Sequence, residues 1–261
     1  MPITTKAQRH KGFMAHYVHP QKIARNRRLC IKRRVALLVE IIGYIGKRNA
    51  IPILLRGLRS LESSEYDSVG IAILSDSLKI CKGVGRMDMA VKESDLKNLL
   101  GNIGIAHTRR ATHGRVCTAN AHPHTDCTGR IAIAHNGIIS NYKDLKRRLI
   151  NQGHKFASST DSEVIAHLIE EKTKRCSSFQ NSCIEAFQEL EGCYSVLVIS
   201  EDPRRIAAFR RDMPLAIGLV DHGFIFASSE PAIRELSKRV AYIQNNSMAI
   251  ACKKEVIMHN I

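Results

Sequence analysis

Short apolar runs alternate with amphipathic segments along most of this chain, and that alternation limits the folds open to it. Runs such as Ile41 to Gly46, Val69 to Leu74 and Ile131 to His135 have the length and β-branched content of strands. Apolar residues recur at helical spacing over residues 49–61 and again over residues 141–190. Further strands are expected at residues 78–84 and 103–108, with a helix over residues 94–100 between them. Strands such as residues 223–227 return in the last third, where a helix over residues 231–238 interrupts them. This order predicts an α+β fold of two sheets with helices covering their outer faces.

Length and composition agree with a folded chain. The 261 residues are 44% hydrophobic, which is enough for a full core in one large domain or two small ones. No apolar run reaches the roughly 18 residues of a membrane span. The eight cysteines include no Cys-x-x-Cys pair, and no secretion signal is evident, so we expect reduced thiols and a cytoplasmic protein.

The net charge of +16 is concentrated at the N-terminus. Residues 1–38 hold ten Lys or Arg and no Asp or Glu, so residues 39–261 carry only +6. We predict a basic extension without fixed structure at 1–38 and one domain at 39–261. The extension can be a nucleic-acid tail, a transit peptide or a solvated segment. It lacks the interleaved aromatics of a stacking surface, which makes a nucleic-acid partner the weaker interpretation.

One cysteine and histidine cluster suggests zinc. Cys117, His122, His124 and Cys127 lie within eleven residues, but their spacing fits no standard structural site. Side chains of His122 and His124 would also point in different directions along an extended segment. We therefore expect no metal here, and no metal or other cofactor elsewhere in the chain.

Three polar points stand at the ends of predicted elements. Arg109 follows a strand and can hold a carboxylate through two parallel hydrogen bonds. Asn136 and Gly137 follow another strand and can stabilise an oxyanion through an amide and a backbone N–H. Asp161 opens a helix and can accept from an ammonium group. Together Arg109 and Asp161 would form an amino-acid clamp. Each of the three points also has a purely structural interpretation. Arg109 can be part of a surface ion pair, Asn136-Gly137 a plain turn and Asp161 a helix N-cap.

The order of these motifs resembles one family. From Ile41 to about Ile261 the chain is similar to the glutaminase domain of glutamine-fructose-6-phosphate aminotransferase, also called glucosamine-6-phosphate synthase, a class II glutamine amidotransferase. The matching runs are Ile41 to Gly46, Gly57-Leu58-Arg59, Tyr66-Asp67-Ser68, Gly104 to Arg109 with Ala111 to Gly114, Asn120 to His124, His135 to Ile139 and Asp161 to His167.

This resemblance implies a four-layer αββα sandwich of the N-terminal-nucleophile hydrolase type, with no metal in the site. It implies that Arg109 holds the α-carboxylate of glutamine and Asp161 its α-amino group, while Thr112 and His113 line the pocket. Asn136 and Gly137 would form the oxyanion hole. An N-terminal Cys attacks the glutamine amide in this family, and the released ammonia passes to an isomerase half that makes an amino sugar from fructose 6-phosphate.

The chain departs from the family at that nucleophile. The family's Met-Cys-Gly start aligns its Cys with Val39 and its Gly with Glu40. Valine has no nucleophilic atom, and its nitrogen is a mid-chain amide here, so the attacking group and the base are both missing. Loss of a nucleophile typically lowers turnover on the order of a million-fold. Cys30 lies nine residues too early to replace it, and Arg110 stands where the family has Trp.

We therefore predict a glutaminase-type domain that is inactive as written. The rival hypothesis is a non-catalytic protein that binds glutamine or docks onto an isomerase subunit. The chain ends where a glutaminase domain should, so the isomerase half is expected in a separate domain or subunit. Whether the chain counts as an enzyme depends on Val39.

Overall fold

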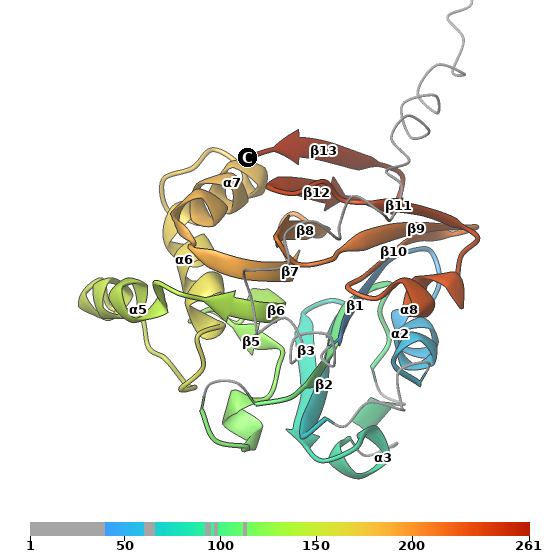
Figure 1. The fold of residues 1–261 in the computed structure, drawn as a ribbon, viewed down its shortest axis with the longest axis horizontal. Coiled ribbons are helices and arrows are strands. Elements are labelled where there is room, and N and C mark those ends of the chain that lie inside the picture. The colour runs from blue at the N-terminus through green and yellow to red at the C-terminus, as the bar shows by residue number, and fades with distance from the viewer. Residues whose placement is uncertain (1–39, 60–65, 92–94, 97–98, 112–113) are drawn as a thin grey trace, which may run out of the picture.

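Two antiparallel sheets stack face to face at the centre of the protein (Figure 1). The computed structural model describes residues 40–59, 66–91, 95–96, 99–111 and 114–261. The first sheet has the strand order β11-β9-β10-β1-β4-β2-β3 and the second β13-β12-β8-β7-β6-β5. The strands of the first sheet are β1 (Glu40–Gly46), β2 (Ser68–Leu74), β3 (Leu78–Val84), β4 (Ile103–Arg109), β9 (Ala216–Val220), β10 (Gly223–Ala227) and β11 (Arg239–Tyr242). Those of the second are β5 (His124–Thr125), β6 (Ile131–Ile139), β7 (Gly192–Ser200), β8 (Arg205–Arg211), β12 (Ser247–Ala251) and β13 (Val256–Asn260).

Helices cover the outer face of each sheet. The helices packed on the first sheet are α2 (Ala50–Arg59), α3 (Met87–Ala90) and α8 (Glu230–Arg234). The helices on the second are α5 (Tyr142–Asn151), α6 (Glu163–Thr173) and α7 (Phe179–Glu189). The layers therefore run helix, sheet, sheet, helix, which confirms the predicted α+β sandwich (Figure 1).

The hydrophobic core has three parts because each sheet is covered on both faces. Ile41, Ile105 and Leu197 belong to the part between the sheets, and the other two parts lie beneath the two helix layers. Every residue of β1 is buried. This explains why its sequence is continuously apolar after Glu40 and does not alternate with polar residues.

Most predicted elements are confirmed, with boundaries that move by a few residues. Strands at Leu78–Val84 and Gly223–Ala227 match their predicted bounds. Of the helix predicted at 94–100, residues 95–96 are helical and residues 99–100 are not, while residues 94, 97 and 98 lie outside the described residues. The helix predicted at 231–238 ends at Arg234, and the short strand β11 that follows it was not predicted.

The prediction of a turn at Asn136-Gly137 is wrong. Both residues lie inside β6, which continues to Ile139 and pairs with β7 along its whole length. Gly137 has φ +124°, and a Cβ there would collide with the backbone oxygen of Cys193. The positive φ that makes Asn-Gly a turn signal is thus used within a strand, because pairing with β7 outweighs the local preference.

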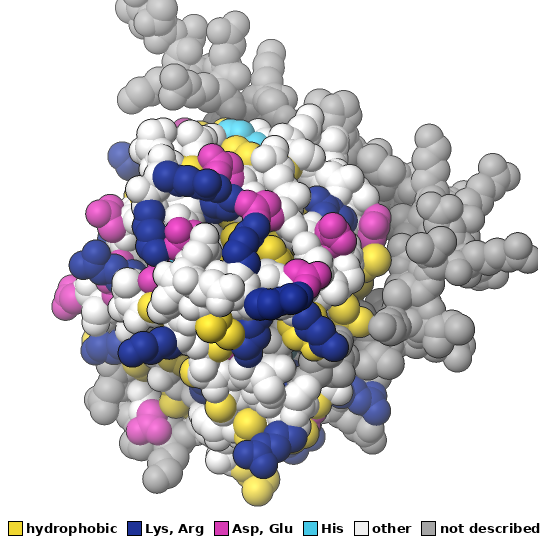
Figure 2. All heavy atoms as spheres, turned by 90° about the vertical axis from the view of Figure 1, so that its left-hand side faces the viewer, with side chains coloured by type: hydrophobic (Ala, Val, Ile, Leu, Met, Phe, Trp, Pro, Cys, Tyr) yellow, Lys and Arg dark blue, Asp and Glu magenta, His cyan; other side chains and the backbone are white. Residues whose placement is uncertain are grey.

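Charged side chains of both signs share the helix-covered surface. Figure 2 shows Lys and Arg interspersed with Asp and Glu on the face that carries α5 and α6. Ion pairs such as Arg147–Asp144 and Lys174–Glu171 link neighbouring turns there. Among the described helices, none is both long enough and apolar enough to cross a bilayer.

Candidate functional site

Arg109 is held at the end of β4 by Asp67. Its side chain is buried, and its Nη1 lies 3.6 Å from Asp67 Oδ1. The Asp67 amide donates to the Arg109 carbonyl at 2.8 Å, and Asp67 Oδ2 accepts from the Ala111 amide at 2.5 Å. Burial lowers the pKa of Arg109, while the carboxylates of Asp67 and Asp161 oppose that shift. Asp67 therefore positions Arg109 and keeps it charged.

Asp161 is fixed against the second sheet. Its Oδ2 accepts from the Ile139 amide of β6 at 2.8 Å. Its neighbours are anchored as well, because Thr160 Oγ1 lies 3.2 Å from His124 Nε2 and Ser162 Oγ lies 2.8 Å from His135 Nδ1. The N-cap position of α6 is occupied by Ser162. The simple N-cap interpretation of Asp161 is therefore wrong, since its carboxylate reaches a strand.

A histidine contact brings β4 and β6 together. His107 Nε2 donates to the carbonyl oxygen of His135 at 2.9 Å, and both residues are buried. Burial lowers the pKa of His107 to about 3, so this imidazole is neutral at physiological pH. The contact lies two residues before Arg109 and one residue before Asn136. It therefore places the predicted carboxylate binder beside the predicted oxyanion hole.

Glu40 lies at the entrance of the chain into β1, next to this group. It pairs in register with Thr108, and its amide donates to Thr108 Oγ1 at 3.3 Å. Ser228 Oγ donates to Glu40 Oε2 at 2.6 Å. Burial raises the pKa of the Glu40 carboxyl to about 7, against the effect of the Ser228 hydrogen bond. A buried acid thus stands one residue from Arg109 in the sheet register.

The structure brings Arg109, Asn136, Gly137 and Asp161 into one region through β4, β6 and the start of α6. Asn136 is buried and Gly137 is partly exposed. The other predicted pocket residues, Thr112 and His113, lie outside the described residues, as do Val39, Cys30 and the basic extension at 1–38.

Sequence reasoning missed the supports of this site. Asp67 was noted only as part of a matching run, although it fixes Arg109 from both main chain and side chain. His107 and His135 were likewise given no role. The available signal was their position next to Arg109 and Asn136 at the ends of apolar runs.

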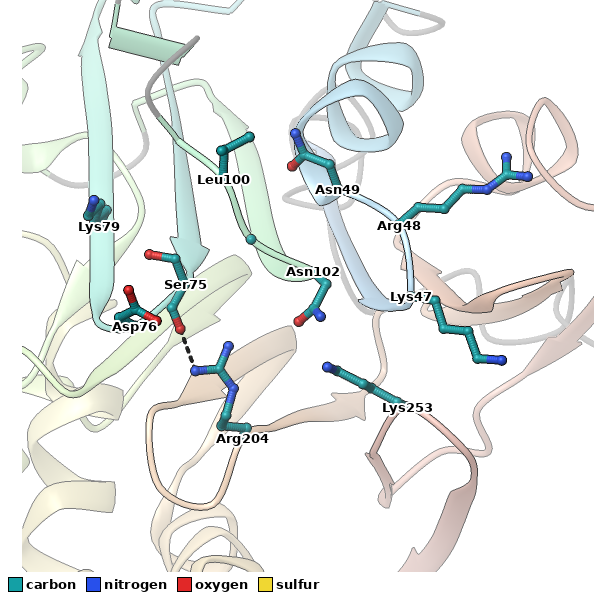
Figure 3. Close-up of a pocket in the computed structure, with 11 residues that line it drawn as sticks. Lys47, Arg48, Asn49, Ser75, Asp76, Lys79, Leu100, Asn102, Arg204 and Lys253 are labelled. Carbon is teal, nitrogen blue, oxygen red and sulfur yellow. Dashed lines mark hydrogen bonds between the residues drawn. The ribbon is translucent and has the colours of Figure 1, made fainter.

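A separate hollow lies at the other end of β1 and β4. This cavity of about 700 Å³ is lined by residues that follow β1 and β2, by Lys79 of β3, by residues that precede β4, and by one residue each from the turns before β8 and β13 (Figure 3). Five of its lining residues are cationic, namely Lys47, Arg48, Lys79, Arg204 and Lys253. Arg204 Nη2 donates to the Leu74 carbonyl at 3.3 Å. Arg109, Asn136, Gly137 and Asp161, the predicted site residues that the structure describes, do not line it, so the two regions are distinct.

The chemistry of the Arg109 region suits an amino-acid amide. A guanidinium and a carboxylate can bind the two ends of a zwitterion, and an amide side chain with a glycine N–H can polarise a carbonyl. These four groups do not include a nucleophile.

Comparison with known proteins points to a family that acts on glutamine, which is an amino-acid amide. A family model described as "Glutamine amidotransferase domain" matches residues 107–235. The chain is 44% identical over 215 residues to the glutamine-fructose-6-phosphate aminotransferase (isomerizing) of Pyrococcus horikoshii, a match that covers 82% of this chain and 36% of that protein. It is 42% identical over 213 residues to the enzyme of the same name from Thermus thermophilus, covering 80% of this chain and 34% of that protein.

Solved structures show the same fold. The glutamine phosphoribosylpyrophosphate amidotransferase of B. subtilis, complexed with ADP and GMP, superposes with a TM-score of 0.73 at 26% identity. That match covers 85% of this chain and 49% of the other. A structure described as the allosteric regulatory enzyme of purine biosynthesis gives a TM-score of 0.74 at 27% identity. The chain thus corresponds to one part of longer relatives.

Proposed function

The chain belongs to the class II glutamine amidotransferase family, and from that premise we propose that it is a glutaminase-type domain that binds glutamine without releasing ammonia. Glutamine would bind with its α-carboxylate on Arg109 and its α-amino group on Asp161. Thr112 and His113 would line the pocket. Asn136 and the Gly137 amide would face the side-chain carbonyl.

The observation that carries this proposal is the preorganised pair of Arg109 and Asp161. Asp67 holds the guanidinium from one side, and the Ile139 amide holds the Asp161 carboxylate. Both side chains are buried, so their interactions with a zwitterion would be stronger than in water. Rigid binding groups lose little entropy when a ligand binds, which favours affinity.

The proposed lack of turnover rests on residues 39 and 40. Val39 offers no nucleophilic atom where the family has Cys, and no free α-amine is available at a mid-chain amide. Glu40 places a buried, ionisable carboxyl at the start of β1, and its main chain pairs with Thr108 of β4. Its negative form would oppose the charge that develops on a tetrahedral intermediate.

Two measurements test the proposal. Isothermal titration of the full chain with glutamine should give binding, and Arg109→Lys should weaken it because Lys cannot make two parallel hydrogen bonds. Arg56→Lys is the matched control, since Arg56 pairs with Glu235 on the exposed surface. Absence of heat at millimolar glutamine, or equal affinity in the Arg109 and Arg56 variants, would contradict the binding site.

Catalysis is tested by ammonia release. The chain as given should show none above background. A version that starts at residue 39, with Cys at 39 and Gly at 40, should gain activity if the remaining site is intact. Ammonia production by the unmodified chain would overturn the proposed inactivity.

The fixed geometry of Arg109 and Asp161 also supports a second candidate, a non-catalytic glutamine sensor or a subunit that docks onto an isomerase. The chain spans only 36% of its Pyrococcus relative, whose name includes the isomerizing activity. We propose that the partner of this chain is an isomerase domain or subunit. Such a partner would allow the chain to serve amino-sugar synthesis. Glutamine-dependent co-purification with an isomerase would support docking.

Two further assignments remain predictions. Residues 39–261 would form the amidotransferase domain and residues 1–38 a basic extension. A cytoplasmic location is likewise proposed from the sequence.

A further inference from the structure

Four side chains of metal-ligand type converge beside α6, away from Arg109. Cys127 lies in the loop between β5 and β6, His154 follows α5, and His167 and Glu170 lie on α6. Their donor atoms all lie within 4.8 Å of one another. Both histidines are buried, Glu170 is partly buried and Cys127 is exposed. Three segments of the chain thus meet at one point, with one ligand open to solvent.

The distances match tetrahedral zinc. Zn–S bonds of about 2.3 Å and Zn–N or Zn–O bonds of about 2.0–2.1 Å place ligand atoms about 3.3–3.6 Å apart. Cys127 Sγ lies 3.6 Å from His154 Nδ1 and 3.5 Å from His167 Nδ1. Glu170 Oε2 lies 3.0 Å from His154 Nδ1 and 3.3 Å from His167 Nδ1. One ion at the centre could reach all four atoms with small adjustments.

The remaining ring nitrogens are held by a second set of carboxylates. His154 Nε2 lies 2.9 Å from Glu171 Oε2, and His167 Nε2 lies 3.4 Å from Glu163 Oε1. Metal-bound histidines commonly donate their other N–H to a carboxylate, which fixes the ring and strengthens the ligand. Both histidines show this arrangement with the same nitrogen turned inward.

Proton counting is compatible with an ion at the centre of the cluster when both imidazoles are neutral. A neutral imidazole carries one N–H, so it cannot donate at both ring nitrogens. His154 faces a carboxylate oxygen at each nitrogen, and so does His167. With an ion at the centre, each Nε2–H donates outward and each Nδ1 lone pair faces the metal, so every group is satisfied.

We propose that Cys127, His154, His167 and Glu170 form a structural Zn²⁺ site. Four protein ligands close the coordination sphere, which is typical of structural sites and leaves no open position for a substrate. Sulfur and imidazole ligands select zinc over magnesium or calcium. The ion would tie the β5–β6 loop and the segment after α5 to α6.

The site also bears on the amino-acid pocket. Glu163, which holds His167, accepts from the amides of Ala157 and Ser158 at 2.7 Å each. These contacts fasten the segment that leads to Asp161. Zinc would thus stabilise the start of α6 without touching glutamine, so metal content and glutamine binding can be measured separately.

The sequence pointed to a different set. It grouped Cys127 with Cys117, His122 and His124, and no metal was expected. In the structure the rings of His122 and His124 pack on each other with centroids 4.5 Å apart, whereas Cys127 turns to His154 and His167. Its real neighbours lie 27 and 40 residues further along the chain, beyond the spacing of short zinc motifs.

The test is metal analysis of the full chain after zinc loading and extensive dialysis. We expect about one zinc per chain by elemental mass spectrometry, and at least a tenfold lower content in Cys127→Ser and in Glu170→Gln. Cys252→Ser is the matched control, because Cys252 is a free, partly exposed cysteine that lies outside the cluster. Less than one zinc per ten chains in the parent, or equal content in Cys127→Ser and Cys252→Ser, would overturn the site.

Cobalt loading gives a readout that does not depend on stability. Co²⁺ in the parent should show the intense visible bands of tetrahedral coordination and a thiolate charge-transfer band. Cys127→Ser should lose the charge-transfer band while remaining folded by circular dichroism. A parent spectrum of octahedral cobalt without a thiolate band would refute the proposed ligand set.

Discussion

Replacement of Glu40 by Gln should stabilise the folded protein at pH 8 and leave its stability near pH 4.5 unchanged. The Glu40 carboxyl is buried at the start of β1, and burial raises its pKa from 4.5 to about 7. Ser228 Oγ donates to its Oε2 at 2.6 Å, and the amide oxygen of Gln can accept the same hydrogen bond. The substitution therefore removes an ionisation while keeping shape and contact.

The magnitude follows from linkage. Between pH 4.5 and about 7 the folded state holds a proton that the unfolded state has released, so stability falls as pH rises. A pKa difference of about 2.5 at 1.36 kcal/mol per unit amounts to about 3 kcal/mol, fully lost above pH 7. Gln does not ionise, so the variant avoids this loss. The stability gap between variant and parent should grow from near zero at pH 4.5 to at most about 3 kcal/mol at pH 8.

Urea unfolding at pH 4.5, 6 and 8 measures this gap, because the midpoint shifts with stability while the slope stays constant. Glu255→Gln is the matched control, since Glu255 is exposed, and its effect should stay within about 0.5 kcal/mol. A Glu40→Gln effect on stability of the same size at pH 4.5 and pH 8 would refute this argument. It would mean that the substitution changes packing and that ionisation of the buried carboxyl does not affect stability.

Further predictions follow from the supports of the site and from the core. Asp67→Asn should weaken glutamine binding about tenfold by calorimetry, since it removes the charge that holds Arg109; an unchanged affinity would rule out this positioning role. Gly137→Ala should destabilise the fold in urea by about 2 kcal/mol or more, because its Cβ meets a backbone oxygen at φ +124°. Gly129→Ala, at φ +72° with open space around it, should cost only about 1 kcal/mol; equal losses would mean that the collision is relieved. Phe187→Ala should cost about 3–5 kcal/mol by thermal unfolding, because this ring is fully buried, and a loss below 1 kcal/mol would contradict tight packing there.

Hydrophobic periodicity was sufficient to predict most of the fold. Strands between helix and sheet layers are apolar on both faces, so runs such as 69–74 and 103–108 are visible without knowing their partners. Boundaries moved where tertiary pairing extended an element. β6 continues through Asn136 and Gly137 because β7 supplies partners on that edge. A local turn preference cannot report such a partner, which lies about 60 residues away in the chain.

The site divides in the same way. Arg109 and Asp161 could be proposed from their chemistry at element ends. The Asp67 contact depends on the pairing of β2 with β4, and the His107–His135 contact depends on how the two sheets stack. The Cys127 cluster is the extreme case. Its ligands come from two loops and a helix, and only the packing of α6 against the second sheet brings them together.

We propose that binding and catalysis are separable in this chain because different segments would provide them. The groups that would hold glutamine come from β4, from β6 and from the segment before α6, and their supports come from β4, β6 and the residue before β2. These contacts all lie within the described part of the chain, which begins at Glu40. We propose that Val39 abolishes nucleophilic attack while these contacts keep the shape of the pocket. An affinity for glutamine like that of an active relative, together with no ammonia release, is the combination that this arrangement predicts.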